Sequence, residues 1–411
     1  MRILILKRIN VLLGAGLVSL LTLSLVIYPE AGVNAAIGGM KIFWEIVFPS
    51  LLPFFVLSEI MLGMGVVHFL GVLLEPLMRP LFNVPGVGAF ALSMGLAAGY
   101  PMDAVITGKF RRNKMCTRVE GERLLSFTNT ADPLFIFGAV AVGMFGRPAL
   151  GITLATAHYV ASFTVGIIFK YYHYNDQPLP DGFRDSSGKE GIFNRAVRAL
   201  FKARREDGRP FGRLMGDAVK ESMTTLLMIC GFIMLFSVLV KVTAIFGILN
   251  MITPVIGNIL KVFKISPELA TSVFNGILEI DLGAMAASSA SVPLLDKAII
   301  TSWIIAWSGL SVHGQVASVI HDTDIRMVPY VIARLLHGLF AAFYTWLLLG
   351  PLAIAIAPVS RWATPAGAKF NPLDRIVLTG KQQLIILGIL LAASLLIHFS
   401  NKYVLVRTKK K

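Results

Sequence analysis

The chain has 411 residues, of which 55% are hydrophobic and only 15% charged, and its mean hydropathy is +0.73. Soluble domains carry about 25% charged residues, so this composition excludes a water-soluble protein and predicts one that crosses the membrane several times. The net charge is +15. Lysine and arginine lie in short hydrophilic segments between apolar runs, where they set orientation in the bilayer, so no nucleic-acid partner is expected.

The motifs of several common enzyme classes are missing from the sequence. It contains no HExxH, GxGxxG or GxxxxGK[ST] segment, which argues against a zinc protease, a Rossmann-type enzyme and an ATP-driven pump. Its two cysteines, Cys116 and Cys230, have neither disulfide-framework nor metal-ligand spacing. No residues show the spacing of a nucleophile and its base. We therefore predict no enzymatic activity, no catalytic residues, no bound metal and no cofactor.

Apolar runs long enough to cross a bilayer as helices, about 20 residues each, follow one another along the chain. They lie at residues 9–28, 42–65, 86–107, 124–145, 149–169, 223–246, 266–291, 298–320, 328–357 and 383–400. The first of them, Val11–Ile27, is longer than the roughly 7–15-residue core of a signal peptide. We predict an uncleaved first helix, with cleavage near Ala31–Ala36 as the alternative.

The distribution of basic residues predicts a topology. Basic residues before position 9 place the N-terminus in the cytoplasm. A helix crossing at 86–107 would leave the basic residues that follow it outside, so we predict a re-entrant hairpin broken at Gly99-Tyr100-Pro101. The remaining crossings place the C-terminus in the cytoplasm. This topology has one disadvantage, because it places four basic residues on the outer side of the membrane: Arg361, Lys369, Arg375 and Lys381.

One long hydrophilic segment, residues 170–222, separates two apolar halves. Its basic amphipathic part, Phe193–Arg205, is typical of a helix on the anionic inner leaflet. A connector between the halves is the favoured role of the segment, and docking of a partner is the alternative. We predict five parts: an N-terminal membrane helix and connector at 1–41, a first repeat at 42–169, a cytoplasmic linker at 170–222, a second repeat at 223–320, and C-terminal membrane helices at 321–411.

The two halves share an order of helix breakers at an offset of roughly 180 residues. The matches are Pro76 with Pro254, Pro85 with Pro267, and Gly95 with Gly276. By the predicted topology the first repeat begins outside and the second begins inside, so the repeats are inverted, as in many secondary transporters. The predicted fold is an all-α polytopic membrane protein with inverted repeats, re-entrant hairpins and broken helices.

Two polar strings interrupt the apolar runs and predict a substrate site. The first contains Asn129, Thr130 and Asp132 ahead of Pro133, whose ring removes a backbone donor and restricts the residue before it. Freed carbonyls and side-chain oxygens there can hold Na⁺, a proton or a substrate. The second string contributes four polar side chains: Ser308, Ser311, His313 and Gln315. His313 can donate to an anion. The alternatives are that Asn129 and Asp132 only cap the two half-helices and that His313 is a buried packing residue.

The hairpin tips carry ionisable residues, which are costly inside a membrane and are functional candidates by default. Glu279 and Asp281 are predicted to bind a coupling ion, Na⁺ or H⁺, with an exposed loop as the alternative. The first tip, Gly99-Tyr100-Pro101 with Asp103, is the matching candidate on the inner side. The segment His321–Asp324 looks like a metal cluster, but it falls at a predicted membrane edge, so a solvated loop is favoured.

Five segments carry a resemblance to a known family: FPSLLPFFVLSE (Phe48–Glu59), GLAAGYPMDA (Gly95–Ala104), SFTNTADPLFIFG (Ser126–Gly138), NGILEIDLGA (Asn275–Ala284) and WSGLSVHGQ (Trp307–Gln315). With them the sequence resembles the sporulation integral membrane proteins of the YlbJ, or SpoVV, type over nearly its whole length. In that family these segments form the nucleoside-recognition, or Gate, domain, which is similar to concentrative nucleoside transporters.

The resemblance implies a secondary transporter that moves dipicolinic acid from the mother cell across the outer forespore membrane, in which it would be a multi-pass protein. Hydroxyl groups and half-helix N-termini at the two polar strings suit the carboxylates of this planar aromatic dianion. The expected partners are this anion and the lipid bilayer, and a homo-oligomer is compatible with the sequence. The alternatives are a transporter of another solute, such as a nucleoside, and a non-transporting membrane scaffold of sporulation.

Overall fold

The computed structural model describes residues 2–176 and 191–351 together with 388, 391–392 and 394–395. Within these residues all regular secondary structure is helical, which confirms the predicted all-α class. The first half contains α1 (Arg2–Ile27), α2 (Pro29–Ile42), the π-helix η1 (Phe43–Val47), α3 (Phe48–Gly63), α4 (Val66–Phe82), α5 (Gly88–Ala98), α6 (Met102–Arg112), α7 (Arg118–Thr128), the π-helix η2 (Leu134–Met144) and α8 (Pro148–Phe169).

The second half follows the hydrophilic segment. It contains α9 (Ile192–Asp207), α10 (Phe211–Ile245), α11 (Ile248–Val262), the 3₁₀-helix η3 (Pro267–Leu269), α12 (Ala270–Leu278), α13 (Ile280–Ser289), α14 (Leu294–Trp307), α15 (Gly309–Ile320) and α16 (Met327–Leu349). The predicted helix at 383–400 lies mostly outside the described residues, as do the four basic residues between 361 and 381.

Four helices are long and apolar enough to cross a membrane: α8, α10, the segment Leu294–Ile320 formed by α14 and α15, and α16. Two bent pairs raise the number to as many as six in the described part of the chain. These findings confirm a polytopic membrane protein. The membrane orientation of each helix stays a prediction.

The run at 42–65 was expected to be a separate crossing, but its helix α3 continues through a sharp bend into α4. The bend measures 83° and lies at Gly65, whose φ of +80° is readily adopted only by glycine. Gly247, with a φ of +69°, begins α11 in the same way. A single left-handed glycine therefore turns the chain at the corresponding place in each half.

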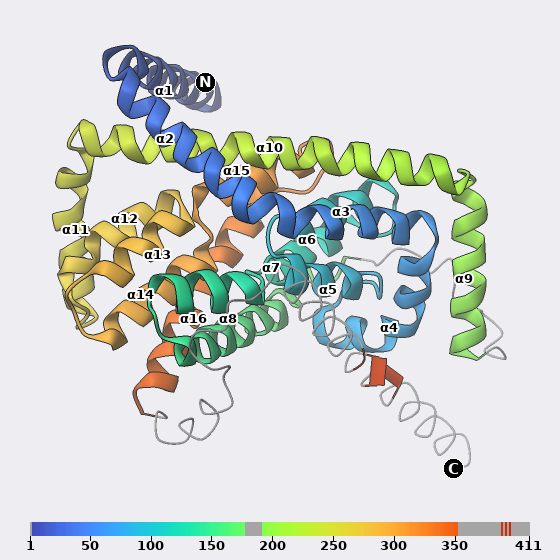
Figure 1. The fold of residues 1–411 in the computed structure, drawn as a ribbon. Helices are drawn as coiled ribbons and strands as arrows, with labels where there is room; N and C mark the ends of the chain where they lie inside the picture. The colour runs from blue at the N-terminus through green and yellow to red at the C-terminus, as the bar shows by residue number, and fades with distance from the viewer. Residues whose placement is uncertain (1, 177–190, 352–387, 389–390, 393, 396–411) are drawn as a thin grey trace.

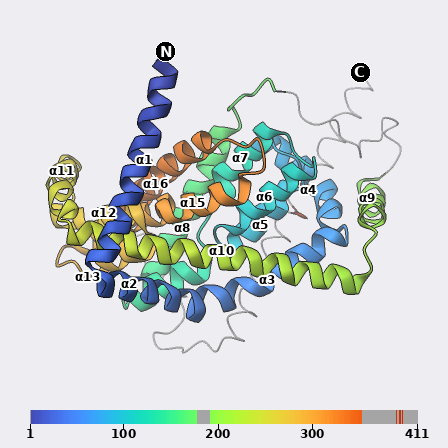
Figure 2. The same cartoon turned by 90° about the horizontal axis from the view of Figure 1, so that it is seen from above.

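Helix α10 runs along one side of the molecule, with α2 and α3 beside it, and α9 and α11 lie at its two ends (Figures 1 and 2). Helices α4 to α7 lie toward one end of α10, and α11 to α14 lie toward the other (Figure 1). Helix α16 packs on α8 and on α14, so it joins the two halves.

The two halves repeat one order of elements. In each half a left-handed glycine precedes a helix that contains a proline, and a second proline precedes a short helical hairpin. The hairpins are α5–α6 and α12–α13, the broken helices are α7–η2 and α14–α15, and a long helix, α8 or α16, ends each half. The opposite orientation of the halves in the membrane and the five domain boundaries stay predictions.

Glycines allow the two arms of each hairpin to pack closely. A Cβ on Gly283 would lie only 2.3 Å from the Cα of Gly276 on the opposite arm. In the first hairpin, a Cβ on Gly95 would lie 3.2 Å from the Cβ of Asp103 and 2.2 Å from the carbonyl oxygen of Thr128. Larger side chains at these positions would force the hairpin arms apart.

Helix α9 contains the whole predicted amphipathic stretch, Phe193–Arg205. Its face of small residues, Ala196, Ala199 and Ala203, is buried, and the helix packs on α4. Phe193 and Phe201 remain exposed on it. The linker therefore docks on the first half, although residues 177–190 lie outside the described part of the chain.

Charged pairs connect the end of the first hairpin to the loop after α15. The Arg111 guanidinium donates to both carboxylate oxygens of Asp324, at 2.6 and 2.9 Å, and Arg112 donates to Asp322 at 2.7 Å. Arg326 donates to Glu122 at 2.8 Å. The segment His321–Asp324 is thus a loop that pairs with arginines, and the described residues contain no group suited to hold a metal.

Substitution of Gly283 by leucine is expected to lower the unfolding free energy by about 1–3 kcal/mol, because the new side chain meets backbone of the opposite arm. Thermal unfolding of the purified protein in detergent measures this. Gly216→Leu on α10 is the matched control, since a Cβ there has no atom within 4 Å. Equal loss of stability in both variants would contradict the close packing.

The hydrogen bonds from Arg111 lower the pKa of Asp324 below its ordinary value. A carboxylate with a lowered pKa stabilises the fold above its unfolded pKa, about 3.9, and loses that contribution as the pH falls through the folded value. Asp324→Asn is therefore expected to cost up to about 1 kcal/mol at neutral pH, the limit for a half-exposed pair, and nothing well below pH 4. Unfolding measured against pH tests this.

The control for that comparison is Glu268→Gln. Glu268 is exposed and forms no ion pair with any described residue, so its loss removes a carboxylate without removing a pair. A destabilisation by Asp324→Asn that stays constant from pH 7 to pH 3 would exclude the ion pair as its cause.

Candidate functional site

The first broken helix stops at the predicted place. Helix α7 ends at Thr128, residues 129–132 are not helical, and the π-helix η2 begins after Pro133. The Asp132 carboxylate accepts from the backbone N–H of Phe135 at 2.9 Å, so it caps η2. The Thr130 hydroxyl donates to the carbonyl of Thr128 at 3.4 Å. Capping was the alternative role foreseen for Asp132, and its bond to Phe135 is such a cap; a role in binding substrate stays a prediction.

Asn129 does more than end a helix, because its side chain joins three elements. Its amide nitrogen donates to the Asp103 carboxylate at 2.8 Å, and its amide oxygen accepts from the Tyr330 hydroxyl at 3.0 Å. The Thr128 hydroxyl donates to the other oxygen of Asp103 at 3.1 Å. Asn129 and Asp103 are both completely buried. The structure thus brings the first break and the first hairpin together.

The second break lies at Ser308, where the backbone adopts a left-handed φ of +69° between α14 and α15. Nδ1 of His313 lies 2.8 Å from the carbonyl oxygen of Gly309, which can only accept, so this bond assigns the proton of the ring to Nδ1. Its ring lies 4.3 Å from that of Trp307, centroid to centroid. Ser311 and Gln315 are also buried on α15. In this tautomer Nε2 of His313 is an acceptor, so donation to an anion requires a second proton.

Helix α16 contributes three residues to the same region. Tyr330, Arg334 and His337 follow one another at spacings of four and three residues, so they share one face of the helix. Arg334 is completely buried. Its guanidinium donates to the carbonyls of Ser126, at 2.6 Å, and of Asn129, and to Nδ1 of His337 at 2.9 Å.

Tyr330 connects the two breaks. Its hydroxyl donates to Asn129 of the first break. Its ring packs against that of His313, with centroids 5.1 Å apart, and its hydroxyl interacts with Ser308 of the second break. Residues predicted from two separate strings therefore meet around one side chain of α16.

Two histidines from corresponding helices lie against each other beside this centre. The backbone N–H of Ala131 donates to Nε2 of His158 at 3.0 Å, and Nε2 of His337 bonds to the carbonyl of His158 at 2.8 Å. The two rings are 4.5 Å apart. These bonds assign the proton of His158 to Nδ1 and that of His337 to Nε2.

The hairpin tips pack on the breaks. A Cβ on Gly99 would lie 2.9 Å from an Asp132 carboxylate oxygen, and the Tyr100 hydroxyl donates to the Ile305 carbonyl at 3.2 Å. In the second half, the backbone of Glu279 lies beside Gly309. Pro101 occupies the position directly before α6.

Glu279 is buried, so the exposed loop tip foreseen as an alternative is wrong for it. Its carboxylate accepts from the Leu282 N–H at 2.9 Å and caps α13. Asp281, in the first turn of α13, is partly buried. A coupling ion at either residue stays a prediction.

Three of these residues were missed in the sequence: Tyr330, Arg334 and His337. The signal for two of them was present, because an arginine and a histidine inside the apolar run 328–357 are as unusual as the carboxylates that were singled out. Another buried ionic group, Glu59, pairs with Lys109 away from the centre.

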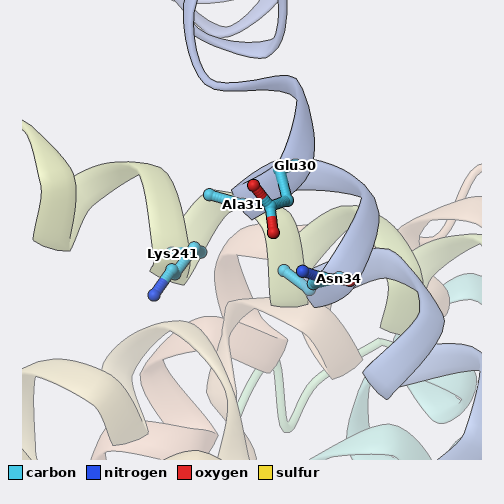
Figure 3. A pocket seen from close by; sticks show the side chains of 5 residues that line it. Glu30, Ala31, Asn34 and Lys241 are labelled. Carbon is cyan, nitrogen blue, oxygen red and sulfur yellow. The ribbon is translucent and has the colours of Figure 1, made fainter.

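A pocket of about 500 Å³ lies elsewhere, between α2 and α10. Figure 3 shows Glu30 and Asn34 on α2 and Lys241 on α10 at its walls. None of its lining residues belongs to the two breaks or the hairpins. The arrangement of buried polar groups, rather than this pocket, marks the candidate site.

Comparisons with known proteins agree with this architecture. A model of the Gate family, described as nucleoside recognition, matches residues 44–171, which contain the first hairpin and the first break. The chain is 44% identical over 378 residues to the sporulation integral membrane protein YlbJ of Bacillus subtilis, covering 90% of this chain and 88% of the relative. No solved structure matches the chain.

Tyr330→Phe removes the hydroxyl that joins α16 to Asn129, and it leaves a buried amide oxygen with one partner fewer. The expected loss of unfolding free energy is about 1–2 kcal/mol, read as a lower Tm in detergent. Tyr171→Phe is the control, since Tyr171 is 67% exposed. Equal Tm values for Tyr330→Phe and the parent protein would show that the link contributes nothing.

Proposed function

Since the chain belongs to the YlbJ family of sporulation integral membrane proteins, we propose that it is a secondary transporter that moves dipicolinic acid across the outer forespore membrane from the mother cell. The observation that carries the proposal is the convergence of two broken helices on one buried polar centre. Broken helices in lipid are tolerated where they are buried in protein or line a cavity. In secondary transporters such breaks form the substrate site.

Dipicolinate fits the chemistry of this centre. It is a planar aromatic dianion, so its site needs donors for two carboxylates and flat apolar surfaces for the ring. Hydroxyl and amide donors come from the predicted residues Asn129, Thr130, Ser308 and Ser311, and Trp307 and His313 offer two neighbouring aromatic rings. Glu279 and Asp281 would repel a dianion, so we assign them to a coupling cation, Na⁺ or H⁺.

The repeated order of elements supports alternating access. Two halves with the same hairpin and break can exchange their arrangements, which gives inward- and outward-facing states of similar energy. In this proposal the lipid bilayer is the surrounding partner, both termini are cytoplasmic and no enzymatic step takes place.

A second candidate is a nucleoside carrier. The observation that favours it is the match to the family described as nucleoside recognition over residues 44–171. A nucleoside is uncharged, and competition with uridine therefore separates the two substrates. A scaffold that transports nothing would tolerate substitutions at both breaks.

The test is uptake of dipicolinate into proteoliposomes that hold only this protein, with Na⁺, proton or no gradient. We expect saturable uptake that uridine does not inhibit. Asn129→Ala and His313→Ala are each expected to lower the initial rate at least about tenfold, because each removes a buried polar group that borders the centre. Asn250→Ala, at an exposed position on α11, is the control.

The outcomes discriminate among the candidates. Inhibition of dipicolinate uptake by uridine would support the nucleoside carrier. No uptake under any gradient would support the scaffold. Uptake at the parent rate by both variants would remove these two residues from the site.

A further inference from the structure

Arg334 is a buried cation whose hydrogen-bond partners are all uncharged. The structure gives it two backbone carbonyls and His337 as partners, and in the described part of the chain it forms no ion pair with a carboxylate. Its Nε–H has no hydrogen-bond partner there either. A guanidinium is always protonated, so this centre holds a full positive charge whose Nε–H donor is unused.

A buried charge without a paired carboxylate costs several kcal/mol. Capping of two carbonyls accounts for two of the nitrogens but does not require a charge, because a neutral donor would also satisfy a carbonyl. Arginine is the side chain that binds carboxylates best, through donors in a fixed fork. The unused Nε–H and the lack of a carboxylate hydrogen-bonded to the guanidinium in the described part of the chain together point to an anionic ligand.

Asp103 is a carboxylate of the protein itself that is linked to Arg334 through Asn129. Arg334 donates to the Asn129 carbonyl, and the Asn129 amide donates to Asp103. The Asp103 charge also acts on the guanidinium electrostatically. A ligand carboxylate near Arg334 would therefore be repelled by Asp103 while it is attracted by Arg334.

Only the second half of the chain places an arginine at this position of its last long helix. Arg334 lies seven residues after the start of α16, and the residue seven after the start of α8 is Ala155. The repeat thus supplies one guanidinium for the pair of breaks.

We propose that Arg334 binds one carboxylate group of the transported anion, and that Asp103 competes with that carboxylate for the same positive charge. This inference rests on the proposed transport of an anion and assigns the recognition of its charge. Arg334 is then the specificity residue that separates a carboxylate from an uncharged ligand of the same shape.

The test is calorimetric titration of the full-length protein in detergent with dipicolinate and with its uncharged diamide. Arg334→Gln is expected to weaken dipicolinate binding about 30-fold or more and to abolish the preference over the diamide. Arg334→Lys keeps the positive charge but loses the planar set of donors, so its affinity for dipicolinate should lie between those of the parent protein and Arg334→Gln. Arg147→Gln, at an exposed position, removes the same charge elsewhere and serves as the control.

Asp103→Asn is expected to change the affinity for dipicolinate in the opposite direction. The amide keeps an oxygen for Asn129 and removes the competing charge, so dipicolinate is expected to bind about tenfold more tightly. The double variant Arg334→Gln/Asp103→Asn removes both buried charges together, which restores charge balance if Arg334→Gln alone folds poorly. It should bind dipicolinate about 30-fold or more weakly than Asp103→Asn, because the two variants differ only in the guanidinium.

Three results would overturn the inference: parent-like affinity in Arg334→Gln, the same affinity in the double variant as in Asp103→Asn, or unchanged affinity in Asp103→Asn. If the parent protein binds no dipicolinate, the proposed function fails on that substrate, and the same series is titrated with benzoate and picolinate. If benzoate or picolinate binds and its binding depends on Arg334, the inference about Arg334 is supported although dipicolinate is not the substrate. Binding of no carboxylate overturns it too.

Discussion

The structure of the candidate site depends on how a helix ends among apolar surroundings. Where α7 stops, its last carbonyls have no water to bind, and an unpaired buried carbonyl costs about 1–3 kcal/mol. Arg334 satisfies those of Ser126 and Asn129 from a position 205 residues beyond Asn129. A cation at a helix C-terminus also complements the helix dipole. The break, and with it the position of the Asn129 side chain, is thus maintained by the other half of the chain.

A second constraint is the lack of space around the breaks. Gly95 lies so close to the carbonyl of Thr128 that no Cβ fits, and Gly309 lies beside the backbone of Glu279. Each hairpin can therefore reach the break of its own half only where a glycine removes the side chain. Movement of a hairpin and movement of its break are coupled by this packing, because neither can shift far without the other.

The sequence predicted the elements that local chemistry determines. The polar residues ahead of Pro133, the Gly99–Pro101 tip and the polar string after Trp307 each interrupt an apolar run, and a helix ends at each of them. The continuation of α3 into α4 was missed because a left-handed φ at Gly65 cannot be distinguished from an ordinary glycine in a sequence. The partners of Arg334 were beyond prediction for a different reason. The residue is recognisable as unusual, but its contacts with Ser126 and Asn129 span about 200 residues and exist only in the packed fold.

The two halves are alike in their helices and unlike in their side chains. His158 and His337 each lie ten residues after the first residue of α8 and α16, and their rings are 4.5 Å apart. The two histidines therefore lie at corresponding positions of the two helices and pack against each other. Arg334, one turn away from His337, breaks that symmetry, since its counterpart is Ala155. The two halves thus share the positions of their breaks, and one arginine without a counterpart gives the shared centre a single positive charge.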